Sequence, residues 1–252
     1  MADKLAIITG ASSGIGLELA KLAAQDGYDL LLAADTPFTG VPREAETLEV
    51  DLSTFEGVDR LLGEAGGRQI DLLCANAGHG LGHAFLDQDP ADWRHVVDTN
   101  VIGTAYLLQK VLQRMVARND GKVLVTGSVA GYIPGSFQAV YNGTKAFVDS
   151  FVAALQNELK DADGVTITNL MPGPVETEFF HRADMDDTSV GAGSKSDPAK
   201  VAKDGWQALM AGKASVFSGL GTKAQGVLAN VTSNAVLAER HRQMAEPGTA
   251  KE

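Results

Sequence analysis

Tyr141 and Lys145 stand four residues apart in a segment whose apolar spacing predicts a helix over residues 139–160. Their side chains would lie on one face of that helix and could meet the same ligand. A tyrosine hydroxyl has a pKa near 10 and is a poor base at neutral pH, but a nearby cation lowers that pKa. The pair could therefore move a proton to or from an oxygen atom, as a carbonyl requires when its carbon exchanges a hydride.

A hydroxyl suited to the same oxygen lies thirteen residues before this tyrosine. Ser128 follows the apolar segment 122–126, which is typical of a buried strand, and α/β proteins build their sites at the carboxyl ends of strands. It could donate a hydrogen bond to charge that develops on the oxygen. Tyr106 and Lys110 have the same spacing, but Trp93 takes the place of the serine there. We therefore assign Tyr106 to helix packing.

A glycine-rich turn, Gly10-Ala11-Ser12-Ser13-Gly14-Ile15-Gly16, directly follows the first apolar segment. Glycine permits a tight turn and close backbone approach, and the amino end of the following helix favours a pyrophosphate. A strand-to-helix turn that merely needs glycine would look similar. Its position at the first βα junction favours a dinucleotide site.

Together these motifs make the chain resemble the short-chain dehydrogenase/reductase family, over Leu5 to about Thr177 and more loosely beyond. Two positions depart from the family pattern: Ala75 replaces the first asparagine of its NNAG motif, and Gly143 stands where many relatives have alanine. The resemblance, with the charge at Asp35, implies these cofactor-binding residues: Gly10, Ser12, Ser13, Gly14, Ile15, Gly16, Asp35, Asp51, Leu52, Asn76, Ala77, Gly78, Tyr141, Lys145, Pro172, Gly173, Val175 and Thr177.

The same resemblance implies a catalytic set of Asn100, Ser128, Tyr141 and Lys145. Lys145 would also bond the nicotinamide ribose, and Asn100 would hold a water that links Lys145 to solvent. The implied activity is hydride transfer between NAD(P)(H) and a secondary alcohol or ketone. The rival hypothesis is a catalytically silent dinucleotide-binding regulator or scaffold on the same fold, but such a protein gains nothing evident from keeping all four residues.

The cofactor preference depends on Asp35, at the end of the second predicted strand. Its carboxylate could accept hydrogen bonds from the ribose hydroxyls of NAD and would repel the 2′-phosphate of NADP, so we expect NAD(H). NAD-specific relatives usually carry their aspartate one position earlier, where this chain has Ala34. The alternative is that Asp35 points away and leaves Thr36 or Arg43 to meet a phosphate.

Short apolar segments alternate with segments of helical spacing along the whole chain. The apolar ones, at 5–9, 29–33, 47–50, 71–75, 122–126, 165–170 and 214–217, predict strands, and 15–24, 91–117 and 139–160 predict helices. This alternation is typical of an α/β fold: a doubly wound, mostly parallel seven-stranded sheet of Rossmann type with helices on both faces. We expect a single domain over residues 1–252.

The composition narrows the function further. Of 252 residues, 21 are basic and 32 acidic, which gives a net charge of −11 and argues against a nucleic-acid partner. No apolar segment approaches the length of a membrane helix, and Met1-Ala2-Asp3-Lys4 leads into a strand rather than a signal peptide, so we expect a cytoplasmic protein. The family resemblance implies a homodimer or homotetramer built partly from helices around 101–117 and 146–160.

The remaining reactive side chains fit no separate site in the sequence. His79 and His83 have no cysteine or third histidine near them, so we expect no metal site, and the two histidines either border the substrate cleft or lie at its solvent edge. Cys74 ends an apolar segment and is interpreted as a core residue. The polar segment 181–196 predicts a mobile substrate loop, ended by Asp197 as a helix cap before Pro198.

Overall fold

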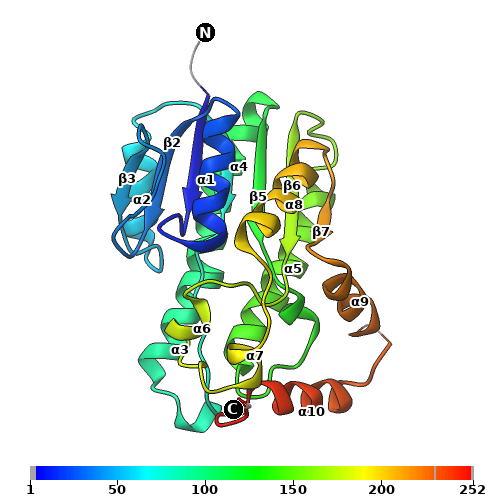
Figure 1. Ribbon diagram of the computed structural model, residues 1–252. Coiled ribbons are helices and arrows are strands. Elements are labelled where there is room, and N and C mark those ends of the chain that lie inside the picture. The colour runs from blue at the N-terminus through cyan, green and yellow to red at the C-terminus, as the bar shows by residue number, and fades with distance from the viewer. Residues whose placement is uncertain (1–3, 230, 251–252) are drawn as a thin grey trace.

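Seven parallel strands form one sheet in the computed structural model, which describes residues 4–229 and 231–250 (Figure 1). The strands lie in the order β3-β2-β1-β4-β5-β6-β7, so the predicted doubly wound sheet is confirmed. Their bounds are β1 (Leu5–Thr9), β2 (Asp29–Ala34), β3 (Glu46–Glu49), β4 (Ile70–Ala75), β5 (Gly121–Thr126), β6 (Val165–Met171) and β7 (Ser215–Phe217).

Helices cover both faces of the sheet, because alternate side chains of each strand point to opposite faces. In β1, Leu5 and Ile7 pack with residues of α2, α4 and α5, whereas Ala6 and Ile8 pack with residues of α1 and α8. The helices are α1 (Gly14–Gln25), α2 (Phe55–Glu64), α3 (Pro90–Val97), α4 (Thr104–Arg118), α5 (Ala139–Glu158), α6 (Phe179–Arg182), α7 (Ser189–Ala192), α8 (Pro198–Met210), α9 (Leu220–Ala229) and α10 (Asn234–Ala245).

The helix expected over residues 91–117 is interrupted. Helices α3 and α4 are separated by a π-helical segment, Asp98–Gly103. In this segment Gly103 packs against the loop that follows β3. A β-carbon at Gly103 would come within 1.9 Å of the Leu52 carbonyl oxygen. An apolar pattern read at 3.6 residues per turn does not reveal this wider turn, and π segments often occur at functional sites.

The segment expected as a loop over 181–196 is partly helical. It begins in α6, contains α7, and ends at Asp197, which caps α8 by accepting a hydrogen bond from the Ala199 amide, as predicted. The end of the described chain docks on it: the Ala250 amide donates to the Asp187 carbonyl at 2.9 Å. Its mobility stays a prediction.

The strand order reverses between β1 and β4, and the carboxyl ends of these strands point toward α3, α6 and α7 in Figure 1. Open parallel sheets bind their ligands at this switch point. Within the described residues, no helix is both long and apolar enough to cross a membrane.

Candidate active site

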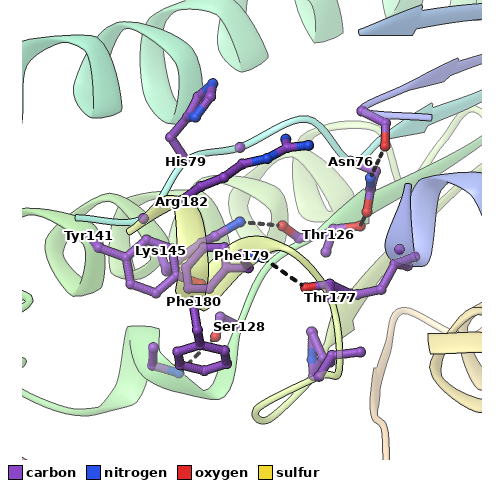
Figure 2. Close-up of a pocket in the computed structure, with 18 of the residues that line it drawn as sticks. Asn76, His79, Thr126, Ser128, Tyr141, Lys145, Thr177, Phe179, Phe180 and Arg182 are labelled. Carbon is purple, nitrogen blue, oxygen red and sulfur yellow. Dashed lines mark hydrogen bonds between the residues drawn. The ribbon is translucent and has the colours of Figure 1, made fainter. Parts of the chain in front are cut away.

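A cavity of about 250 Å³ lies at the carboxyl ends of the strands. It gathers almost all of the residues expected from the sequence, including Ser128, Tyr141 and Lys145 (Figure 2). The expected cofactor-binding residues that line it are Gly10, Ser12, Ser13, Gly14, Ile15, Asp35, Asp51, Leu52, Asn76, Ala77, Gly78, Tyr141, Lys145, Pro172, Gly173, Val175 and Thr177. Gly16 and Asn100 do not line it, and both support residues that do.

The glycine-rich turn has the conformation that its glycines allow. Gly10 and Gly14 adopt φ values of +63° and +56°, which disfavour any residue with a β-carbon. Gly16 supports the turn from below, because a β-carbon there would come within 2.2 Å of the Gly10 carbonyl oxygen. The amino end of α1 is thereby held at the cavity, where its free amides and dipole suit a phosphate.

Asn76 braces this turn from the neighbouring strand. Its Nδ2 donates to the Thr9 carbonyl at 3.1 Å and to the Gly10 carbonyl at 3.4 Å, and its Oδ1 accepts from the Thr126 hydroxyl at 3.0 Å (Figure 2). The side chain thus joins the ends of β1, β4 and β5. Its polar atoms are engaged within the protein, so its role toward a cofactor is to shape the cradle.

Lys145 is buried at the floor of the cavity, and its Nζ donates to the Thr126 carbonyl at 2.8 Å. Burial lowers the pKa of Lys145 to about 8, although the charge of Asp149 opposes this shift. Nζ lies 6.0 Å from the centre of the Tyr141 ring. The ammonium group is therefore held by the end of β5 and beneath the tyrosine.

The Tyr141 hydroxyl does not have the lowered pKa that the sequence suggested. Burial raises its pKa to about 12, a hydrogen bond with Ser128 works in the opposite direction, and the charge of Asp149 raises it further. Desolvation of the anion is the largest of these causes, and the Nζ of Lys145 donates to the Thr126 carbonyl. In this state Tyr141 carries its proton at neutral pH.

Ser128 lies beside Tyr141 because it follows the carboxyl end of β5. It begins the 3₁₀ turn Val129–Tyr132, and its Oγ accepts a hydrogen bond from the Ala130 amide at 3.1 Å. That contact leaves the hydroxyl proton free to point at Tyr141 or at a substrate oxygen. Two hydroxyls and one ammonium group therefore meet at one end of the cavity.

Asn100 acts on the loop after β4. Its Oδ1 accepts from the His79 amide at 2.8 Å, and its Nδ2 donates to the His79 carbonyl at 2.9 Å and to the Thr144 hydroxyl at 3.0 Å. The side chain lies in the π-helical segment and is buried. Its amide is thus used to join this loop to α5, and the water expected at Asn100 stays a prediction.

A buried carboxylate that sequence reasoning missed lies one helical turn beyond Lys145. Asp149 Oδ1 accepts from Asn169 Nδ2 at 2.8 Å, while Oδ2 is buried and has no hydrogen-bond partner among the described residues. Burial raises the pKa of Asp149 to about 6, opposed by Asn169 and by the charge of Lys145. Gly127 makes room for it, because a β-carbon there would come within 1.9 Å of Oδ1.

Asp35 lines the cavity, as expected, at the end away from Tyr141. Its carboxylate contacts the His79 side chain there. His79 Nε2 lies 3.1 Å from Asp35 Oδ2, and this contact is the main cause that lowers the pKa of Asp35. The positive charge of Arg182 also lowers the pKa of Asp35. Thr36, the alternative phosphate contact, shares a hydrogen bond of 2.9 Å with Ser12.

The region beside Tyr141 is apolar and aromatic. The Phe179 ring centre lies 5.0 Å from that of Tyr141, and Phe180 packs edge-on against Phe179 (Figure 2). His241 and Met244 of α10 complete this end of the cavity. The Phe179-Phe180 pair, separated by Glu178 from Thr177 of the expected cofactor segment, was the available sequence signal, whereas nothing in the sequence connects α10 to the cavity.

The residues set aside in the sequence lie elsewhere. Tyr106 is absent from the cavity lining, stacks on Phe55 with ring centres 4.3 Å apart, and donates to Asp59 at 3.0 Å, so its assignment to packing holds. Cys74 is buried, and burial raises the pKa of its thiol. His83 pairs with Asp184 and does not line the cavity.

Comparison with known proteins agrees with this geometry. Residues 4–188 match the family model described as short chain dehydrogenase. The chain belongs to the short chain dehydrogenase family. An uncharacterized oxidoreductase of Staphylococcus saprophyticus is 32% identical to it over 219 residues, which cover 82% of this chain and 91% of that protein.

Solved structures of other short chain dehydrogenases share the fold. One from Burkholderia phymatum, in complex with NAD, superposes with a TM-score of 0.79 at 24% identity and covers 90% of this chain and 92% of that one. One from Sphingobium yanoikuyae, in complex with NADPH, gives a TM-score of 0.77 at 24% identity, covering 91% and 96%.

Proposed function

We propose that this short chain dehydrogenase transfers a hydride between NAD(P)(H) and a secondary alcohol or ketone. The observation that carries the proposal is the meeting of Ser128, Tyr141 and Lys145 at one end of a cavity whose other end holds the glycine-rich turn. The cavity fits a dinucleotide, because Gly10 and Gly14 form the cradle that a pyrophosphate needs. When bound, the nicotinamide supplies or accepts the hydride.

The protein's own residues would handle the proton and the charge on the substrate oxygen. In the reduction direction, Tyr141, which carries its proton at neutral pH, donates that proton to the carbonyl oxygen. Ser128 donates a hydrogen bond to the same oxygen. Lys145 lies beneath them and, as in the family, would hold the nicotinamide ribose.

The lining supports a substrate with apolar groups beside the carbonyl. Phe179 packs beside Tyr141, Phe180 packs edge-on against Phe179, and Ile133, Val190 and Met244 also line the cavity. These side chains favour apolar contact, while Glu178, Arg182 and His241 add polar and charged groups to the same lining. A panel of ketones and alcohols followed by cofactor absorbance, from aryl and alkyl ketones to polar sugars, would rank the substrates.

We propose NAD(H) as the preferred cofactor. Asp35 lines the cavity at the end of β2, and its lowered pKa keeps it anionic at neutral pH, which opposes a 2′-phosphate. Arg182 and His79 reduce this effect, so we expect a preference rather than an absolute choice. The ratio of kcat/KM for NADH and NADPH measures it, and a tenfold preference for NADPH would contradict the role of Asp35.

We also propose a homodimer or homotetramer that uses α4 and α5. Ile102, Val116 and Phe147 are large apolar side chains on this part of the chain that are 36–43% exposed. Phe147 stacks on Phe151 along the surface of α5. Light scattering on the purified protein tests this, and a Phe147→Glu variant should shift the protein toward monomers if α5 forms the interface.

The decisive test replaces Tyr141 by phenylalanine. The ring still packs and only the proton-transfer hydroxyl is lost, so kcat should fall by about 10²–10⁴-fold while dinucleotide affinity stays within a few-fold. Tyr106→Phe is the matched control, because that tyrosine contacts Phe55 and Asp59 and not the cavity.

More than about a tenth of the wild-type kcat in Tyr141→Phe would refute the mechanism. The rival hypothesis, a silent dinucleotide-binding regulator, predicts instead that wild-type protein binds the dinucleotide and turns over none of the panel.

A further inference from the structure

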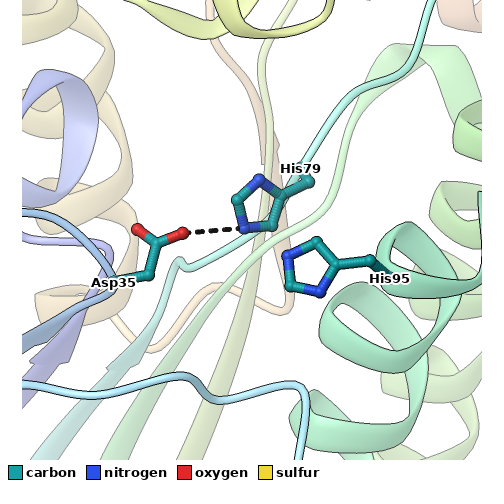
Figure 3. Close-up of side chains that lie close together, drawn as sticks. All are labelled: Asp35, His79 and His95. Carbon is teal, nitrogen blue, oxygen red and sulfur yellow. Dashed lines mark ion pairs between the residues drawn. The ribbon is translucent and has the colours of Figure 1, made fainter. Parts of the chain in front are cut away.

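Three ligand-type side chains from three separate elements converge at the Asp35 end of the cavity (Figure 3). Asp35 directly follows β2, His79 lies in the loop after β4, and His95 lies on α3. One ligand atom from each lies within 4.8 Å of those of the other two. His79 Nε2 and Asp35 Oδ2 are 3.1 Å apart, and the two imidazole ring centres are separated by 4.6 Å.

Two imidazoles and a carboxylate form a donor set that binds Zn²⁺ and similar divalent transition metals. With metal–ligand bonds of about 2.0–2.2 Å, a tetrahedral ion separates its ligand atoms by about 3.3 Å. The Asp35–His79 pair already meets that separation. His95 is half-buried on α3, and one of its ring nitrogens lies within 4.8 Å of the ligand atoms of Asp35 and His79.

We propose that Asp35, His79 and His95 bind a divalent transition metal ion, and that this ion competes with the dinucleotide. The sequence suggested no metal site because the partners of His79 are distant along the chain. Asp35 and His79 both line the cavity, so a fourth coordination position would face it. We call these three residues the Asp-His-His cluster.

The cluster differs from the two other histidine–aspartate pairs of the described residues. His83 lies 2.9 Å from Asp184, and His181 lies 2.7 Å from Asp186. In both pairs the side chains are more exposed than in the cluster, where His79 and Asp35 are 24% and 36% exposed. Neither pair has a second imidazole stacked on it within the described part of the chain. The cluster alone combines two imidazoles with a carboxylate there.

Charges around the Asp-His-His cluster both favour and oppose the binding of a metal cation. The net charge of −11 favours cations, and Asp35 supplies a carboxylate to the cluster. The positive charge of Arg182, which lines the same cavity, repels a metal ion. Replacing Arg182 by glutamine should therefore tighten metal binding, whereas loss of either histidine should weaken it.

Competition follows from the shared carboxylate and rests on the proposed function. Under that function Asp35 accepts hydrogen bonds from the adenosine ribose, and its oxygens cannot serve a metal ion at the same time. His95 does not line the cavity. A variant at His95 can therefore remove the metal site and leave the dinucleotide site intact.

The first experiment titrates chelator-treated full-length protein with Co²⁺, followed by visible absorption, and then displaces it with Zn²⁺. Wild-type protein should bind one equivalent, and His79→Gln and His95→Gln should each weaken binding by about tenfold or more. His83→Gln is the matched control, because it removes a histidine paired with an aspartate outside the cluster. Equal titrations for wild type and both cluster variants, or an equal loss in His83→Gln, would overturn the site.

The second experiment titrates NADH by fluorescence at several fixed Zn²⁺ concentrations. The apparent Kd of NADH should rise with Zn²⁺ in wild type and stay constant in His95→Gln. An unchanged Kd in wild type would overturn the competition. If the protein binds no dinucleotide at all, the proposed function fails, while the Co²⁺ titration still decides whether the cluster binds metal.

Discussion

Replacing Asp149 by asparagine should remove a pH-dependent loss of stability. Asparagine keeps the shape and the Oδ1 acceptor that Asn169 uses, and it removes the charge from an oxygen with no hydrogen-bond partner among the described residues. The pKa of Asp149 is raised to about 6 from its ordinary value of 3.8. The folded protein therefore holds this proton more tightly than the unfolded chain does.

The sign and size of the effect follow from this difference. Below about pH 3 the carboxyl is protonated in both states. Between about pH 4 and 6 the unfolded chain has released its proton while the folded state still holds it, so stability falls across this window and levels off above about pH 7. A pKa of about 6 against 3.8 limits the loss to about 3 kcal/mol by pH 7, roughly half of it between pH 5 and 7. At about 2–4 °C per kcal/mol, the melting temperature should fall by about 6–12 °C.

The assay compares the melting temperatures of wild type and Asp149→Asn from pH 4 to 7.5. Wild type should lose stability relative to the variant as the pH rises. Asp204→Asn is the control, because its pH dependence should have the opposite sign. Burial alone would raise the pKa of Asp204, but its contacts with Lys200 and Ser218 outweigh burial, and the net pKa is lowered. Wild type should therefore gain stability relative to this variant as the pH rises. The reasoning would be refuted if the difference in melting temperature between wild type and Asp149→Asn did not change with pH, or if wild type became more stable relative to the variant as the pH rises.

Three further predictions concern the turn, the floor of the cavity and the segment beside it. Gly143→Ala should raise the free energy of unfolding by up to about 1 kcal/mol, because the added β-carbon meets no neighbouring described atom within 4 Å. Gly16→Ala should lower the free energy of unfolding by about 1–3 kcal/mol and weaken dinucleotide binding, because its β-carbon would meet the Gly10 carbonyl. Urea unfolding compares the two variants, and equal effects would contradict the turn geometry. Lys145→Ala should reduce both kcat and dinucleotide affinity relative to Lys110→Ala, and an equilibrium titration showing unchanged affinity would exclude the ribose contact. Backbone amides of 181–196 should gain hydrogen-exchange protection when dinucleotide and substrate bind together, and strong protection in the free protein would reject a closing segment.

The sheet could be predicted because its signal is local. The strands are short apolar segments bounded by polar turns, and their ends agree with the expected ones to within one or two residues. That Ser128, Tyr141 and Lys145 line one cavity could also be predicted, since a helical turn and a strand end fix their positions; their catalytic roles stay a prediction. Chemistry carried by neighbours along the chain is visible in the sequence.

Contacts between distant elements could not be predicted in the same way. Asp149 occupies an ordinary helical position in the sequence, and only the structure shows that it meets Asn169 of β6 beneath Gly127. The pKa of Tyr141 was misjudged for the same reason, because desolvation depends on what surrounds a side chain. The Asp-His-His cluster joins three elements that no local pattern connects.

The division of the cavity between two stretches of chain has a consequence for how the protein's specificity can evolve. The family match ends at residue 188, and the walls contributed after it are Val190, Gln225, His241 and Met244. The glycine-rich turn, Ser128, Tyr141 and Lys145 all lie before this later stretch. Under the proposed function, mutations from residue 189 onward can therefore change part of the substrate wall and leave the residues assigned to the cofactor and the proton unaltered.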